Sequence, residues 1–411
     1  MQFRSIVYFI LFLSLFSCNH QQEEVSKDKD VVTKKYWNAH LQLTEDIQLP
    51  FTLSTTESKN DTFIEIYNDQ EVIKLNVTQL NDSARYDFDA YSNYLILKKS
   101  NNKINGYFVQ PDRTSHNRIP LSGEYYGDDK PEVHSRNNLS VDGKWKVFFN
   151  ANLENQYPAI GEFKQTKQGR VTGTFMTETG DYRFLDGYLE KNKLLLSTFD
   201  GSHAFLFTAD LNKDTLDGMF YSGRHWSTNW VGVKNDTFSL TNPNELTYLV
   251  KDSFQFAFPT VEKNLYTYPN DELKEKVTII QILGTWCPNC MDETSFYKDL
   301  YDKYHNKGLE IIGVAYEYPS EFKDQAERVK SYIKNLDVPY AILVGGKASK
   351  SKASTDFSML NEISSFPTSI FINKKGEIVK IHTGFNGPGT GEVYSDYVRK
   401  TNSLIHKLLN E

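Results

Sequence analysis

The chain has 411 residues, which is enough for two or three domains at about 150 residues each. Lys and Arg total 46 against 53 Asp and Glu, for a formal charge of -7. Nucleic-acid binding depends on neutralising phosphates with a basic surface, so this balance argues against a nucleic-acid partner. Only three cysteines are present, Cys18, Cys287 and Cys290, which is too few for a disulfide scaffold or a four-cysteine metal site.

The first residues have the pattern of an export signal. Arg4 supplies a basic start, and the apolar run Ile6–Phe16 has 11 residues, shorter than the roughly 20 that a spanning helix needs. We therefore expect a signal peptide over residues 1–17. Leu15-Phe16-Ser17-Cys18 resembles the bacterial lipobox, which implies that Cys18 is acylated and becomes the new N-terminus. The alternative is an ordinary cleaved signal with an incidental cysteine.

The segment that follows Cys18 is polar and charged. Residues 18–35 contain few core-forming side chains, and this composition predicts a flexible tether. An exported protein works in an oxidising compartment, where a pair of cysteines needs a dedicated electron donor or serves as an oxidant.

Residues 36–236 are divided into short alternating segments separated by turn signals. Examples are Thr62–Tyr67 and Lys144–Phe149, with Asn68-Asp69 and Lys191-Asn192 among the turns. This spacing predicts an antiparallel, all-β barrel or sandwich.

Two parts of this β-rich region echo each other, over residues 36–127 and 140–236. Residues of the first part recur in the second in the same order and at nearly equal spacing: Trp37, Pro50, Phe88 and Asn105-Gly106 against Trp145, Pro158, Phe199 and Asp217-Gly218. We interpret the match as a diverged duplication of about 100 residues. The alternative is chance matching at turn glycines and aromatic residues.

The pattern changes after residue 250, and residues 253–411 alternate between strands and helices. Expected strands are Lys276–Leu283, Leu309–Ala315, Tyr340–Val344, Thr368–Ile372 and Glu377–His382, and expected helices are Pro288–Asn306, Ser320–Asn335 and Glu392–Leu409. This β-α-β-α-β-β-α order is that of a thioredoxin-type sheet. The Lys- and Ser-rich piece Gly345–Asp356 is expected to be a mobile surface loop.

Cys287 and Cys290 form a C-x-x-C pair where the first of these strands gives way to a helix. Free N–H groups and the helix dipole would stabilise a thiolate at Cys287, which makes it the expected nucleophile. Pro288 suits the first helical turn, and Cys290, one turn on, is the expected resolving thiol. Trp286 would form an apolar rim beside the exposed sulfur. Glu293 lies three residues beyond Cys290, close enough on the same helical face to exchange a proton with it.

These residues carry a resemblance to a known family. Trp-Cys-Pro-x-Cys, Glu293 and Phe366-Pro367-Thr368 fall where the TlpA-like disulfide reductases, membrane-tethered bacterial proteins of thioredoxin fold, have them. The resemblance implies a cis peptide bond at Pro367, and a backbone at Phe366 and Thr368 that lies opposite Cys287 and binds an extended substrate. Thioredoxins often have a buried acid six residues before the first cysteine, whereas Gln281 stands there and cannot titrate. This departure moves the expected proton relay toward Glu293.

The sequence thus predicts a lipid-anchored thiol–disulfide oxidoreductase of the cell envelope, facing the periplasm. It would reduce disulfides of exported proteins after being recharged by a membrane thiol donor. No cofactor or metal is expected, since zinc would need two more ligands near the pair, and after His305 the next histidine is His382. The loop Gly384–Gly391 lacks the lysine of a phosphate-binding loop and is expected to border the active-site face.

Two alternatives remain open at this stage. One is an oxidase or isomerase of the same fold, because the four-residue motif alone does not fix the direction of electron flow. The other is a ligand- or protein-binding β-domain with an accessory redox domain, in which Tyr221, Trp226 and Trp230 would line a pocket. The sequence does not identify the client, the donor or the membrane that carries the anchor.

Overall fold

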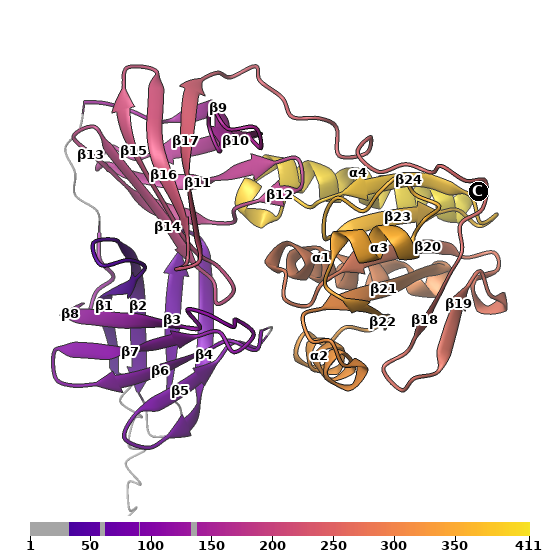
Figure 1. Ribbon diagram of the computed structural model, residues 1–411, viewed down its shortest axis with the longest axis horizontal. Helices are drawn as coiled ribbons and strands as arrows, with labels where there is room; N and C mark the ends of the chain where they lie inside the picture. Colours follow the sequence, from indigo (N-terminus) through magenta and orange to yellow (C-terminus); the bar gives the residue numbers. More distant parts are fainter. Residues whose placement is uncertain (1–32, 58–61, 90, 133–137) are drawn as a thin grey trace, which may run out of the picture.

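The computed structural model describes residues 33–57, 62–89, 91–132 and 138–411. The predicted signal peptide, Cys18 and most of the predicted tether lie outside the described residues. Two β-barrels stand on one side of the molecule and an α/β domain on the other (Figure 1). In the part of the chain that is described, no helix is both long and apolar enough to cross a membrane.

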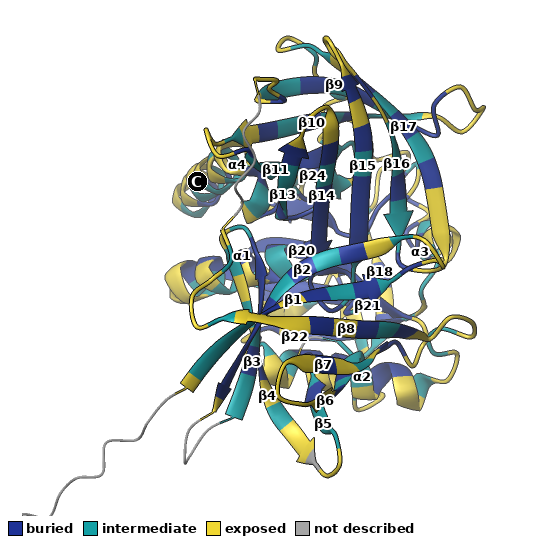
Figure 2. Cartoon of the chain, turned by 90° about the vertical axis from the view of Figure 1, so that its left-hand side faces the viewer, coloured by how far each residue is buried: buried dark blue, intermediate teal, exposed yellow. Residues whose placement is uncertain are grey.

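The first barrel is closed and antiparallel, with neighbouring strands in sequence order. Its strands are β1 (Thr33–Gln42), β2 (Gln48–Glu57), β3 (Thr62–Asn68), β4 (Glu71–Leu80), β5 (Ala84–Asp87), β6 (Tyr94–Lys99), β7 (Lys103–Val109) and β8 (Arg118–Gly127). Side chains alternate between the core and the outside, as at Trp37, Ala39 and Leu41, and Figure 2 shows this alternation. Thr33–Lys35, which we assigned to the tether, belong to β1 and pair with β2.

The second barrel closes through a pairing of β10 with β11. Its strands are β9 (Gly143–Phe149), β10 (Tyr157–Gln165), β11 (Arg170–Thr177), β12 (Gly180–Asp181), β13 (Leu185–Glu190), β14 (Lys193–Phe199), β15 (Ala204–Asn212), β16 (Thr215–Ser222) and β17 (Trp226–Lys234). Its core is rich in aromatic rings, and Trp230 is fully buried against Phe149 and Phe175. Trp230 is therefore a core residue and not part of a pocket wall.

Matched positions of the proposed duplication occupy equivalent strands of the two barrels. Trp37 and Trp145 lie on the first strand of each, and Gly106 and Gly218 lie on the next-to-last strand. A Cβ on Gly106 would lie 1.8 Å from the carbonyl oxygen of Ile96, and one on Gly218 would lie 2.0 Å from that of Thr208. At both positions the preceding strand passes so close that a side chain would not fit. This shared requirement for glycine supports the proposal of a duplication.

The C-terminal domain has the predicted fold class. A hairpin of β18 (Phe256–Pro259) and β19 (Leu265–Tyr268) precedes a five-stranded sheet of order β22-β21-β20-β23-β24. Its strands are β20 (Val277–Leu283), β21 (Leu309–Glu317), β22 (Ala341–Lys347), β23 (Thr368–Ile372) and β24 (Ile378–Thr383). Its helices are α1 (Pro288–Tyr304), α2 (Phe322–Asn335), α3 (Lys350–Asp356) and α4 (Glu392–Asn410), with short 3-10 turns at Asp271–Leu273, His305–Lys307 and Pro388–Thr390. β20, β21 and β22 are parallel to one another. β23 is antiparallel to β20, and β24 is antiparallel to β23, as in a thioredoxin sheet.

The predicted mobile loop at Gly345–Asp356 is wrong. β22 continues to Lys347, and the rest of the segment forms α3. The Ser349 hydroxyl caps this helix by accepting from the backbone N–H of Lys352 at 3.2 Å, and Ala353 is buried in the domain core. A single buried face on a short polar helix leaves too weak a periodic signal to be recognised in the sequence.

Candidate active site

The C-x-x-C pair lies where the central strand β20 ends and α1 begins. All seven residues of β20 are buried, so this strand holds the start of the loop that follows it in a fixed position. Cys287 is the N-cap residue of α1, and Pro288 takes the first helical position, where a missing N–H costs nothing. Both cysteines are free thiols; Cys287 is 9% exposed and Cys290 is 0% exposed. This arrangement matches the predicted division into an outer and an inner thiol.

The segment around Pro367 lies against the outer thiol. The Phe366–Pro367 peptide bond is cis, as the resemblance implied, and the Cys287 thiol donates to the carbonyl oxygen of Phe366 at 3.6 Å. Thr368 opens β23, and its hydroxyl donates to the carbonyl oxygen of Ser365 at 2.9 Å. The structure thus brings the predicted substrate-binding backbone to the sulfur of Cys287.

Trp286 forms a wall beside the same sulfur. Its indole N–H donates to the carbonyl oxygen of Tyr316 at 2.9 Å, and its ring meets Phe366 edge to face at 6.1 Å. On the other side, the ring of Tyr318 lies 4.7 Å away. Trp286 is therefore held in place by Tyr316 of β21 and by Tyr318, which lies just after the end of that strand.

Glu293 is completely buried beneath the pair. Its carboxylate accepts hydrogen bonds from Gln281 at 2.9 Å, Ser369 at 3.0 Å and Tyr297 at 3.1 Å. Burial nevertheless dominates, and it raises the pKa of Glu293 to about 7. Gln281, which stands where a thioredoxin often has an acid, thus serves as a hydrogen-bond donor to the acid that is present.

Cys290 and Glu293 influence each other electrostatically. Burial, the hydrogen bond with Cys287 and the charge of Glu293 all raise the pKa of the Cys290 thiol well above its ordinary value. A thiol in such a site loses its proton only to a nearby base. A carboxyl group whose pKa lies near neutrality is suited to that exchange.

A second buried carboxylate was missed by the sequence analysis. Glu317, the last residue of β21, accepts from the backbone N–H of Thr285 at 2.9 Å and from its hydroxyl at 2.7 Å. Burial raises the pKa of Glu317 to about 7. Its contacts fix the loop that carries Trp286 and Cys287. The predicted strand stopped at Ala315, so nothing in the sequence pattern indicated that this glutamate is inside.

The second barrel covers one side of the motif. The side-chain amide of Asn289 donates to the carbonyl oxygens of Phe385 at 2.9 Å and Asp181 at 3.2 Å. The hydroxyl of Ser365, next to Phe366, donates to the carbonyl oxygen of Thr179 at 3.1 Å. The loop Gly384–Gly391, which we expected to border the active-site face, lies in the same place: the backbone N–H of Gly384 donates to the carbonyl oxygen of Pro367 at 2.8 Å, and that of Gly387 to the carboxylate of Asp181 at 2.8 Å. No sequence signal predicted that the second barrel covers this side.

Arg183 ties the three parts of the molecule together. Its buried guanidinium pairs with Glu71 of the first barrel at 2.5 Å, Asp200 of the second at 3.1 Å, and Asp292 of α1 at 2.5 Å. Burial raises the pKa of Asp292 to about 7 even though Arg183 acts in the opposite direction. Glu71 and Asp292 lie more than 100 residues from Arg183 in the sequence, so the chain pattern gave no sign of the cluster.

Residues 249–397 match the family model described as Redoxin. The thiol-disulfide oxidoreductase ResA of Bacillus thuringiensis subsp. konkukian (strain 97-27) is 30% identical over 131 residues, which are 31% of this chain and 65% of that protein. ResA of Bacillus subtilis (strain 168) is 25% identical over 141 residues, which are 34% of this chain and 63% of that protein. The chain therefore spans just under two thirds of the length of the curated relatives it matches.

Among solved structures, StoA from Bacillus subtilis is 26% identical, with a TM-score of 0.25, and covers 34% of this chain and 96% of its own. A thiol-disulfide oxidoreductase from Bacteroides fragilis NCTC 9343 is 15% identical, with a TM-score of 0.27, and covers 35% and 96%. The C-terminal domain is thus similar in sequence to oxidoreductases of the ResA type, in agreement with the resemblance seen in its motifs.

Proposed function

We propose that this chain is a thiol–disulfide oxidoreductase that reduces disulfides of exported proteins through Cys287 and Cys290. One observation carries the proposal: an outer thiol at the N-terminus of α1 touches the backbone of Phe366, above a buried inner thiol and a buried Glu293. The sequence similarity to ResA proteins supports the same chemistry.

The reaction begins with the thiolate of Cys287 attacking one sulfur of a substrate disulfide. The substrate S–S bond breaks, the leaving sulfur takes a proton, and Cys287 is joined to the substrate in a mixed disulfide. Cys290 then gives its proton to Glu293 and attacks the sulfur of Cys287. The second substrate thiol leaves, two electrons have passed to the substrate, and a Cys287–Cys290 disulfide remains. A dithiol donor restores the pair by the same exchange in reverse.

Substrate positioning is assigned to the backbone opposite the sulfur. The main chain of Phe366 beside Pro367 would pair with an extended substrate strand, and Trp286 and Pro288 would shape the surface around the sulfur. Thr368, predicted to bind substrate as well, is fully buried and pairs with Ile282 and Thr383 within the sheet, so its role would be to hold Phe366 in position. Cys287 occupies the place where such a strand would bring its disulfide.

The cellular setting is proposed from the sequence alone. Acylation of Cys18 would anchor the protein to a membrane of the cell envelope, facing the periplasm, and a membrane thiol donor would supply electrons. The described β1 begins 15 residues beyond Cys18, so the barrels would stand close to that membrane.

A Cys290→Ser variant tests the proposal. Without the resolving thiol, Cys287 should stay covalently linked to its substrates, and the adducts should be recovered on a non-reducing gel and disappear on reduction. Cys287→Ser is the matched control and should give none. Recovery of no mixed disulfide from Cys290→Ser would contradict the proposal.

The reduction potential of the pair decides the direction of electron flow. A value near the thioredoxin potential of about -270 mV would support reduction of substrates. A value near about -120 mV would instead indicate an oxidase.

A further inference from the structure

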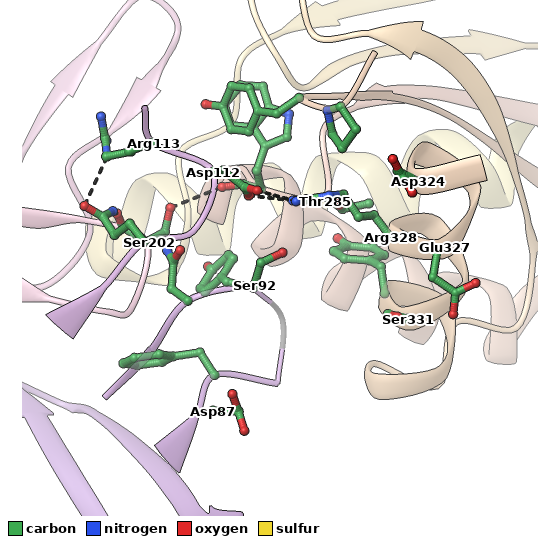
Figure 3. Close-up of a pocket in the computed structure, with 18 of the residues that line it drawn as sticks. Asp87, Ser92, Asp112, Arg113, Ser202, Thr285, Asp324, Glu327, Arg328 and Ser331 are labelled. Carbon is green, nitrogen blue, oxygen red and sulfur yellow. Dashed lines mark hydrogen bonds and ion pairs between the residues drawn. The ribbon is translucent and has the colours of Figure 1, made fainter. Parts of the chain in front are cut away.

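A cavity of about 840 Å³ separates the barrels from the redox domain and opens beside the C-x-x-C motif (Figure 3). The first barrel contributes the turns around Tyr91 and Arg113, and the second contributes Ser202. The redox domain contributes Trp286, Tyr318 and the face of α2. The volume lies in the range of about 300–1,000 Å³ found for pockets that hold small ligands.

The cavity reaches Thr285 and Trp286, the two residues that precede the outer thiol. The hydroxyl of Ser202 donates to the carbonyl oxygen of Trp286, the residue before Cys287, at 3.2 Å. Two tyrosines of the cavity wall contact the segment around the motif: the ring of Tyr318 lies 4.7 Å from that of Trp286, and the hydroxyl of Tyr91 donates to the sulfur of Met291 at 3.7 Å. The cavity wall therefore borders the residues on either side of the cysteine pair.

The opposite approach to Cys287 is closed. Thr179 and Asp181 of the second barrel hydrogen-bond Ser365 and Asn289, and Gly180 forms a β-bridge with Phe385. Cys287 and Phe366 are each 9% exposed. Since a substrate disulfide has to reach the Cys287 sulfur, and this side is covered, the cavity is the route that remains.

The cavity has an excess of negative charge. Within the described residues, its carboxylates Asp89, Asp324 and Glu327 form no ion pair, whereas Asp112 pairs with Arg328 and Asp87 with Arg85. Arg113 is the opposing positive charge, and its guanidinium donates to the side-chain oxygen of Gln110. His225 adds no charge near neutral pH because burial lowers its pKa to about 4.

We propose that the two barrels and α2 together restrict the substrate to an extended, neutral or cationic polypeptide segment that enters this cavity and brings its disulfide to Cys287. A folded protein does not fit a space of this size, and an anionic disulfide is repelled by Asp324 and Glu327. Asp324 and Glu327 favour a cationic substrate, and Arg113 on the opposite wall partly offsets that preference. The inference rests on the proposed disulfide exchange at Cys287 and adds the substrate class and the role of the barrels.

The test compares two disulfide-linked peptides of equal length, one flanked by lysines and one by glutamates, as substrates of the full chain supplied with a dithiol donor. Wild type should reduce the lysine peptide about tenfold faster at low salt, because a charged cleft concentrates ions of opposite sign. Asp324→Asn with Glu327→Gln should bring the ratio close to one. Arg113→Gln should increase it severalfold.

The control is Glu190→Gln with Asp214→Asn. It also removes two negative charges, from the exposed last residue of β13 and from the exposed turn between β15 and β16, at the far end of the second barrel, and should leave the ratio unchanged. A neutral aromatic disulfide of low molecular weight measures the exchange chemistry itself and should react at similar rates with all the variants.

Equal rates for the two wild-type peptides, or a ratio that survives Asp324→Asn with Glu327→Gln, would overturn the inference. So would reduction of a compact folded protein disulfide as fast as of the lysine peptide. These outcomes leave the proposed function intact as long as the small disulfide is reduced in a Cys287-dependent way. Failure to reduce the small disulfide would overturn both.

Discussion

Replacement of Glu293 by glutamine should change how the stability of the redox domain depends on pH. The carboxyl group is fully buried, and its pKa is about 7 in the folded protein against an ordinary 4.5. Because the folded pKa is raised, the protonated acid favours folding, and that stability is present below pH 4.5 and lost as the pH rises through about 7. Glutamine has nearly the same shape and cannot ionise, so the variant escapes the loss.

The size of the effect follows from the two pKa values. Each unit of difference is worth about 1.4 kcal/mol, so the full effect is roughly 3 kcal/mol. Between about pH 5 and pH 8, the free energy of unfolding of Glu293→Gln should rise relative to wild type by roughly 2.5 kcal/mol. Asp292 and Glu317 also titrate, but they are present in both proteins and cancel in the difference.

Amide hydrogen exchange of β20 and β21, with the cysteines kept reduced, measures the free energy of opening at this core. Glu392→Gln changes an exposed glutamate of α4 and is the control. Glu293→Gln should also slow disulfide reduction by about 10²-fold or more, since it removes the acid–base group that serves Cys290, and Glu392→Gln should not. A stability difference that stays flat between the two pH values would refute the reasoning.

Three further variants test how the motif is held in place. Arg183→Met should lower stability by about 3–5 kcal/mol, because it leaves buried carboxylates unpaired; an unchanged thermal midpoint would contradict the role of this residue. Thr285→Val removes a donor to Glu317 and should cost about 1–3 kcal/mol, whereas Thr285→Ser should cost little; equal midpoints would show that the hydroxyl is unimportant. Gly384 and Gly376 both have positive φ, but only a Cβ on Gly384 would clash with the second barrel. Gly384→Ala should therefore destabilise the protein more than Gly376→Ala in denaturant unfolding, and equal losses would argue against the contact.

The redox domain could be predicted from the sequence because its signals are local. The apolar run of β20, the proline after Cys287 and the stop at Gly308 each act within a few residues. Glu293 was found in the same way, since helical spacing alone places it near Cys290. α3 was missed because its single buried residue, Ala353, gives no periodic pattern.

The surroundings of the site could not be predicted, because they depend on contacts between distant parts of the chain. Arg183 lies in a short turn after β12 and gives no local sign that it will be buried against Asp292. Asn289 is the variable position of the motif, and its hydrogen bonds to Asp181 exist only once the second barrel is in place. Physical rules for turns and helices concern residues that are close in the sequence, so they predict neither contact.

The position of the barrels changes what the motif can be expected to do. A C-x-x-C pair at a helix N-terminus on an open surface would accept any disulfide that reached it. Here Asn289 and Ser365 are hydrogen-bonded to the second barrel, and the remaining approach leads past Trp286 through a cavity bordered by both barrels. In this proposal the cysteines determine the chemistry, whereas the barrels and α2 determine which disulfides reach Cys287. Arg113 of the first barrel and Glu327 of α2 lie in the cavity wall and not at the cysteine pair, so changes at either residue should alter the choice of substrate while leaving the exchange between Cys287 and Cys290 intact.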